Sequence, residues 1–114
     1  MARIRQSLAF WCFNRHDLPF LALCHEAKRI GYEGLEMLPG DHWDVARHAG
    51  LKIVTHIAHG TLADGLNRAS NHARIEAEAT ASMTKAAAYQ IPVLICFSGN
   101  RGGISDSEGL CLLY

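Results

Sequence analysis

At 114 residues, the chain is long enough for one domain and too short for two. Apolar residues make up 49% and charged residues 19%, which suits a globular core and argues against intrinsic disorder. Basic and acidic residues number 11 each, so the formal net charge is zero and no electrostatic feature points to nucleic acid or another polyanion.

The composition also argues against a membrane span and a disulfide framework. No run approaches the ~18 consecutive apolar residues that a spanning helix needs, and the first residues lack a convincing signal-peptide cleavage site. The cysteines are widely scattered, and Cys12 and Cys96 stand in the apolar runs FWCF and LICF, where we expect buried free thiols. We therefore predict a reduced, cytoplasmic protein.

Short runs of β-forming residues alternate with amphipathic runs from the start of the chain. Residues 4–13 predict a first strand, and residues 17–30 predict a helix. Asp17 is the candidate N-cap of this helix, and Gly31 is placed to end it. Residues 32–39 then predict a second strand.

The same alternation continues to the end of the chain. Asp41 is the candidate cap of the next helix and Gly50 its end, while Ser105 or Asp106 is placed to begin a last helix. The predicted elements are a helix over 41–50, a strand over 51–58, a long helix over 70–91, an apolar strand over 92–98 that is buried on both faces, and a polar loop over 99–109.

This order predicts an α/β fold with parallel strands and crossover helices. Four such βα units correspond to about half of a (β/α)8 TIM barrel, which usually takes ~250 residues. A flavodoxin-like sheet is the competing closure, although it normally has a fifth strand and a final helix. In either fold, functional residues gather at the carboxyl ends of the strands, here Glu36, His56, His59, Ser98, Asn100 and Arg101.

Glu36 and His56 are predicted to end the second and third strands. A glutamate within the apolar run GLEML is costly to bury without a partner, so it is either a supporting residue of a site or an exposed strand end. A neutral imidazole at position 56 can donate a hydrogen bond to a substrate oxygen. The alternative is a core histidine that the main chain satisfies.

His59 lies three residues beyond His56, in the segment HIAHGTLADGLN. This segment predicts a substrate-facing or lid-like loop, or a purely structural connection. A metal site built on the two histidines is disfavoured, because a strand that turns into a loop does not fix a shared face and no nearby Cys or carboxylate completes the ligand set. Asn100 and Arg101, in SGNRGG, suit a substrate carboxylate, although ordinary loop composition explains them equally well.

Trp11, Phe13 and Trp43 are predicted to pack in the core or at the barrel mouth rather than to hold a cofactor. Arg74 and Glu76 predict a solvated helix face with local ion pairs.

Four segments, in this order and spacing, resemble the hydroxypyruvate isomerase-like branch of the xylose isomerase-like TIM-barrel family, which holds sugar phosphate isomerases and epimerases of carbohydrate metabolism. They are GYEGLEMLP, HGTLADGLN, NHARIEAE and IPVLICFSGNRGGISDSEGL. The resemblance implies that residues 1–110 form the N-terminal half of such a barrel. Residues 111–114 depart from the family pattern, and we expect an interrupted chain there.

The resemblance also implies a reaction, in which a proton moves between adjacent carbons while an enediolate is stabilised. The implied substrate is a small hydroxy-carbonyl acid or sugar. A divalent metal and a pair of glutamates act at the ends of strands five to eight, which this chain does not contain, so we expect no bound metal, no catalytic residue and no isomerase activity from this chain alone. The predicted substrate-binding residues are Glu36, His56, His59, Asn100 and Arg101.

Two alternatives to the isomerase fragment stay open. One is a small non-catalytic α/β binding domain that uses the loops at the strand ends. The other is a half-barrel that self-associates through the exposed edges of its first and fourth strands.

Overall fold

The computed structural model describes residues 4–13 and 17–113. The chain divides into two compact units, the first formed by Met1–His56 with Ala88–Val93 and the second by Ile57–Ala87 with Leu94–Tyr114. Within the described ranges, no helix combines the length and the apolar character that crossing a membrane requires.

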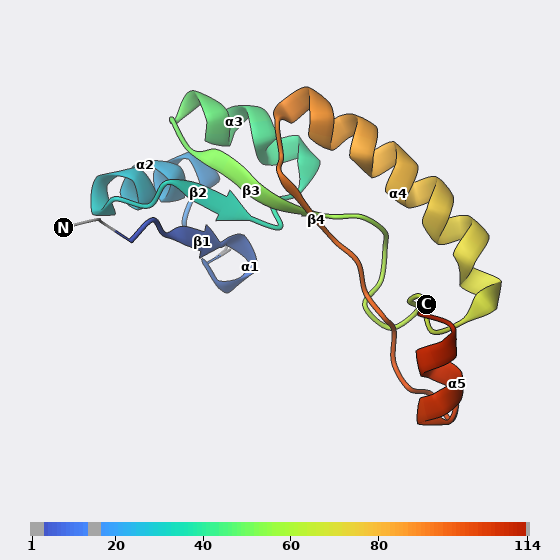
Figure 1. The fold of residues 1–114 in the computed structure, drawn as a ribbon. Coiled ribbons are helices and arrows are strands. Elements are labelled where there is room, and N and C mark those ends of the chain that lie inside the picture. The colour runs from blue at the N-terminus through green and yellow to red at the C-terminus, as the bar shows by residue number, and fades with distance from the viewer. Residues whose placement is uncertain (1–3, 14–16, 114) are drawn as a thin grey trace. The chain divides into compact units, whose positions relative to one another are not determined.

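Strands and helices alternate along the chain as predicted (Figure 1). The strands form one parallel sheet in the order β1-β2-β3-β4, which confirms the α/β class. The strands are β1 (Ser7–Ala9), β2 (Gly34–Glu36), β3 (Lys52–Ile57) and β4 (Val93–Ile95). The helices are α1 (Phe10–Phe13), α2 (Phe20–Ile30), α3 (Trp43–His48), α4 (Ala69–Tyr89) and α5 (Asp106–Cys111), and the 3-10 turn η1 (Gly40–His42) leads into α3.

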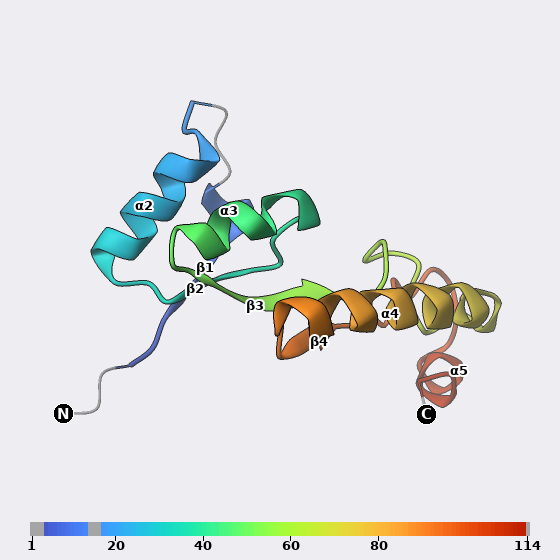
Figure 2. The same ribbon diagram turned by 90° about the horizontal axis from the view of Figure 1, so that it is seen from above.

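The core of the first unit lies between the sheet and two helices. Leu8, Leu35 and Ile53 stand opposite one another on β1, β2 and β3, and all three are buried. Helices α2 and α3 pack against each other and cover one side of these strands (Figure 2). Because side chains alternate along a strand, Ser7 and Glu36 belong to the opposite face of the sheet.

The ends of α2 partly match the prediction. Gly31 ends the helix with φ of 110°, and its N–H donates to the carbonyls of Ala27 and Lys28, as expected for a left-handed C-cap. The prediction that Asp17 caps the helix is wrong, since the N-cap is Pro19. A residue that precedes proline is disfavoured in the helical conformation, so the helix begins only after Pro19.

The caps and bounds of α3 also differ from the prediction. Asp41, the predicted cap, lies inside η1, and the N-cap of α3 is His42, which makes no side-chain capping hydrogen bond. A local side-chain contact anchors the start of α3 instead, because the Trp43 indole N–H donates to the Leu38 carbonyl at 2.8 Å. Gly50, with φ of 80°, follows the end of this helix as predicted.

The first predicted strand, over residues 4–13, is largely wrong. Only Ser7–Ala9 form β1, and Phe10–Phe13 turn into α1. The Phe10 ring is buried and meets the Phe20 ring edge-on at 5.5 Å, and this tertiary contact overrides the β-propensity of the segment. Trp11 and Phe13 are 56% and 45% exposed, and Cys12 is exposed, so the predicted burial of these three residues is wrong.

The second unit contains most of α4, together with α5. Along α4 the expected ion pair forms between Arg74 and Glu78 at 3.0 Å, rather than with Glu76. Ser105 caps α5, with its hydroxyl accepting from the Glu108 N–H, and α5 extends through Cys111 of the segment predicted as a divergent tail.

The predicted burial of the fourth strand on both faces is wrong. Val93 is 47% exposed and Cys96 is exposed. The position of β4 accounts for this exposure, because β4 is an outer strand in the sheet order β1-β2-β3-β4 and has only β3 beside it among the described strands.

Candidate functional site

Glu36 lies at the carboxyl end of β2, as predicted, and has a specific partner. The Ser7 hydroxyl, on the neighbouring strand β1, donates a hydrogen bond to the Glu36 carboxylate. Both side chains are part-buried and lie on the face of the sheet away from α2 and α3. The hydroxyl therefore holds one carboxylate oxygen and orients the group at the strand end.

The residue after Glu36 adopts a rare backbone conformation. Met37 has φ of 49°, in the left-handed region that side chains other than glycine seldom occupy. The Met37 N–H donates to both the carbonyl and the hydroxyl oxygen of Thr55 on β3, at 3.0 and 3.1 Å. Strained residues of this kind are concentrated at ligand sites, and here the strain turns the chain sharply at the strand end.

His56 follows Thr55, the residue of β3 that stands opposite Glu36. Its imidazole meets the indole of Trp43 edge-on, with the ring centroids 4.8 Å apart. Trp43 is 3% exposed and is anchored through its own N–H to Leu38. A buried, hydrogen-bonded indole thus fixes the position of the imidazole at the carboxyl end of β3.

We call Ser7, Glu36, Met37, Trp43 and His56 the carboxyl-edge site. Ser7 and Glu36 lie on the face of the sheet away from α2 and α3, whereas the His56 imidazole meets Trp43 of α3. The carboxylate and the imidazole stand on adjacent parallel strands, and each can form hydrogen bonds with hydroxyl or carbonyl oxygens of a small ligand. Glu36 and His56 lie toward the carboxyl ends of their strands, as predicted, whereas the sequence did not indicate the hydrogen bond from Ser7. The alternation of side chains along a strand predicts that Ser7 and Leu8 point to opposite faces of the sheet. Only the pairing of β1 with β2 shows that Ser7 lies on the same face as Glu36.

A cluster of aromatic rings also lies in the first unit. The His42 imidazole stacks on the Phe20 ring, with centroids 4.3 Å apart and planes inclined by 18°. The Phe10 ring meets both of these rings edge-on at 5.5 Å. This cluster fixes η1 and the beginning of α2, and no pattern in the sequence indicated it.

His59, in the second unit, has both ring nitrogens engaged by the main chain. Nδ1 lies 3.1 Å from the Gly60 carbonyl, and Nε2 lies 3.0 Å from the Phe97 N–H. The two contacts require a neutral ring that donates from Nδ1 and accepts at Nε2. The side chain is 2% exposed, so contact with a ligand would require one of these hydrogen bonds to break.

Asn100 and Arg101 also lie in the second unit, in the loop after β4. The Asn100 main chain is held from both sides, since its N–H donates to Ala63 and its carbonyl accepts from the Asn67 side chain, each at 2.8 Å. The Arg101 guanidinium is exposed and pairs with Asp106 at 3.2 Å. These contacts order the loop and engage part of the arginine fork.

The loop that carries His59 is also held by a carboxylate. Glu78 accepts from the Gly60 N–H at 2.8 Å and pairs with Arg74 at 3.0 Å. The hydrogen bond from Gly60, followed by that from Arg74, holds the pKa of Glu78 below its usual range. The loop is therefore braced on α4 by a charged acceptor.

Among the described residues, no three His, Cys, Asp or Glu side chains come together as a metal ligand set. The predicted site residues divide between the units: Glu36 and His56 belong to the first, and His59, Asn100 and Arg101 to the second. Comparison of the chain with models of protein families, with curated proteins and with solved structures finds no match.

Proposed function

We propose that the chain forms the first four βα units of a (β/α)8 barrel of the hydroxypyruvate isomerase-like kind. The sequential strand order β1-β2-β3-β4 supports this proposal, because a barrel adds each strand beside the previous one. Doubly wound sheets instead reverse their order at a switch point and place helices on both faces. The packing of α2 against α3 on one side of the strands also favours the barrel.

In this proposal the carboxyl-edge site is part of the substrate wall of an aldose–ketose isomerase. The observation that carries it is the placement of Glu36 and His56 at the carboxyl ends of adjacent parallel strands, with Thr55 opposite Glu36. Substrates of TIM-barrel enzymes bind at this edge. His56 would donate to a substrate oxygen, and Glu36, oriented by Ser7, would accept from a substrate hydroxyl.

In this proposal, the residues of this chain do not carry out the proton transfer between adjacent carbons of the substrate. The described residues do not fit the divalent metal that the resemblance implies, since no three possible ligands come together. The chain by itself is therefore expected to bind substrate weakly without isomerising it. A metal-stimulated isomerase rate from the purified chain, lost on Glu36→Gln, would contradict this assignment.

Binding of hydroxypyruvate, followed by saturation-transfer NMR, tests the role of the carboxyl-edge site. We expect saturable binding with a Kd on the order of 1 mM, equivalent to about 4 kcal/mol, since only part of the wall is present. His56→Gln should abolish the signal, whereas His25→Gln, which changes an exposed histidine on α2, should preserve it. Equal binding by the two variants would exclude His56 from the site.

A self-associating half-barrel is the second candidate, favoured by one specific observation. Among the described residues, the order of the sheet leaves β1 and β4 as its outer strands, each with a neighbouring strand on one side. Unpaired strand edges invite pairing with another chain. The molar mass from light scattering after size-exclusion chromatography decides between the candidates. A monodisperse monomer at both a low and a high loading concentration would exclude self-assembly.

A further inference from the structure

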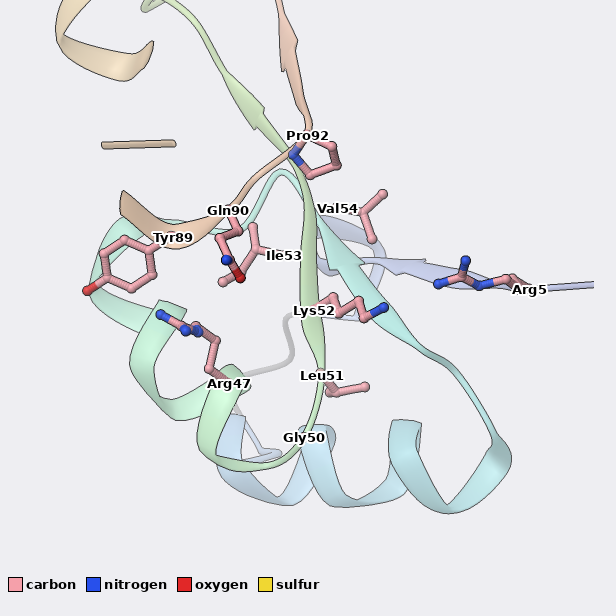
Figure 3. Close-up of a pocket in the computed structure, with 10 residues that line it drawn as sticks. All are labelled: Arg5, Arg47, Gly50, Leu51, Lys52, Ile53, Val54, Tyr89, Gln90 and Pro92. Carbon is pink, nitrogen blue, oxygen red and sulfur yellow. The ribbon is translucent and has the colours of Figure 1, made fainter. Parts of the chain in front are cut away.

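A cleft of about 540 Å³ lies at the amino end of β3, at the opposite end of this strand from His56 (Figure 3). Its lining comes from the first unit alone. Half of the lining residues carry a charged or polar side chain, and the rest are apolar. The lining includes Arg47, Lys52, Ile53, Tyr89, Gln90 and Pro92.

The charge of the cleft lining is one-sided. It contains three cationic side chains, those of Arg5, Arg47 and Lys52, and no carboxylate, although the whole chain has no net charge. Arg5 is neutralised by Glu33, which accepts from it at 2.7 Å. Within the described residues, the side chains of Arg47 and Lys52 form no hydrogen bond or ion pair.

Arg47 is held in place without using its hydrogen-bond donors. Its guanidinium lies 5.3 Å from the centre of the Tyr89 ring. The Tyr89 hydroxyl, in turn, donates to Asp44 at 3.1 Å, and this hydrogen bond raises the pKa of Tyr89. The aromatic ring is therefore fixed at both its face and its hydroxyl, and it presents a preorganised arginine fork to the cleft.

Gln90 adds a neutral polar group beside Arg47. It directly follows α4 with φ of 57°, at a position where helices usually place glycine. Residues other than glycine seldom adopt this conformation. In Figure 3 the Gln90 amide lies on the same side of β3 as Arg47 and Tyr89, whereas Lys52 lies on the other side.

We propose that this cleft binds a small organic anion, a carboxylate or a phosphate ester with an apolar body. The acidic group would accept hydrogen bonds from the Arg47 fork and the Gln90 amide. The body would lie against the exposed Pro92 ring, and Lys52 would contribute longer-range attraction across the strand. The cleft shares no residue with the carboxyl-edge site, so anion binding in the cleft does not depend on the proposed isomerase role.

Titration of the 15N-labelled chain with phenyl phosphate, benzoate and neutral benzyl alcohol tests this proposal. We expect saturable amide shifts at Arg47, Ile53 and Gln90 with at least one of the two acids and none with the alcohol. Saturation by phenyl phosphate alone identifies a phosphate ester as the ligand class, and saturation by benzoate alone identifies a carboxylate. Shifts that rise linearly with concentration for both acids would overturn the proposal.

Variants that each remove one positive charge distinguish binding in this cleft from unspecific attraction of anions to the protein surface. Arg47→Gln should weaken binding at least about tenfold, which equals roughly 1.4 kcal/mol, and Lys52→Gln should weaken it by a smaller factor. Arg29→Gln, which removes an exposed arginine paired with Glu26 on α2, is the matched control and should bind like the wild type. Because Lys52 is exposed, its variant keeps the test decisive if Arg47→Gln does not fold. Equal weakening in Arg29→Gln and Lys52→Gln would refute the site.

Discussion

Replacing Gly34 with alanine should destabilise the first unit, because β2 and β3 approach each other too closely for a side chain at this position. A Cβ atom on Gly34 would lie 2.5 Å from Val54 Cγ2 and 2.7 Å from the Lys52 carbonyl oxygen. Val54 can rotate, but the Lys52 carbonyl is main chain in the paired strand. The clash therefore has to be relieved by a shift of the strand.

The expected cost of Gly34→Ala follows from two opposing effects. Overpacking of this kind costs about 1–3 kcal/mol, whereas a glycine-to-alanine change recovers roughly 0.4–1 kcal/mol by restricting the unfolded chain. We expect a net loss of about 1–2 kcal/mol in the free energy of unfolding, a large part of the 5–15 kcal/mol typical of a small domain.

Urea unfolding followed by tryptophan fluorescence measures this loss. Trp43 is 3% exposed and reports on the first unit, whereas Trp11 is already 56% exposed and should change less. Gly40→Ala is the matched control, since no atom lies within 4 Å of its added Cβ. A Gly34→Ala variant within about 0.5 kcal/mol of the wild type, or an equal loss in the control, would refute the register of β2 and β3.

Three further predictions concern the second unit. Gly65→Ala should unfold the loop before α4, because its Cβ would lie 2.3 Å from main-chain atoms of the segment after β4; loss of amide-exchange protection there would confirm it. His59→Leu should lower the free energy of unfolding by about 1–3 kcal/mol, since the Phe97 N–H would lose its acceptor; unchanged stability in urea would contradict this role. Glu78 has a lowered pKa, so its contribution to stability is complete above the ordinary glutamate pKa and is lost as the pH falls through the lower, folded-state value. Carboxyl 13C titration should show that Arg74→Gln raises this pKa, and an unchanged value would show that the ion pair contributes nothing.

The order of elements could be predicted from the sequence because each crossover carries its own local signals. Gly31 and Gly50 mark the ends of α2 and α3, and both adopt positive φ values. The β-branched run over 51–58 predicted β3, which extends over Lys52–Ile57. Such signals are set by the conformational preferences of single residues and need no knowledge of tertiary contacts.

The largest failure, at the start of the chain, comes from a tertiary contact that outweighs local propensity. Residues 10–13 look like a strand, but burial of the Phe10 ring against Phe20 turns them into α1. The positions of Glu36 and His56 near strand ends could be predicted because the apolar runs that contain them are visible in the sequence. The hydrogen bond from Ser7 to Glu36 depends on strand register, and the edge-on contact between Trp43 and His56 depends on helix packing. The sequence does not display either of these.

The most direct test of the central claim is a titration of the 15N-labelled chain with hydroxypyruvate. If the carboxyl-edge site is part of a substrate wall, the amides of Met37 and His56 should shift and saturate together, with a Kd on the order of 1 mM. The amides of Lys52 and Gln90, at the amino end of β3, should move less. Saturable shifts confined to the amino end, or no saturable shift at all, would contradict the assignment of substrate binding to Glu36 and His56.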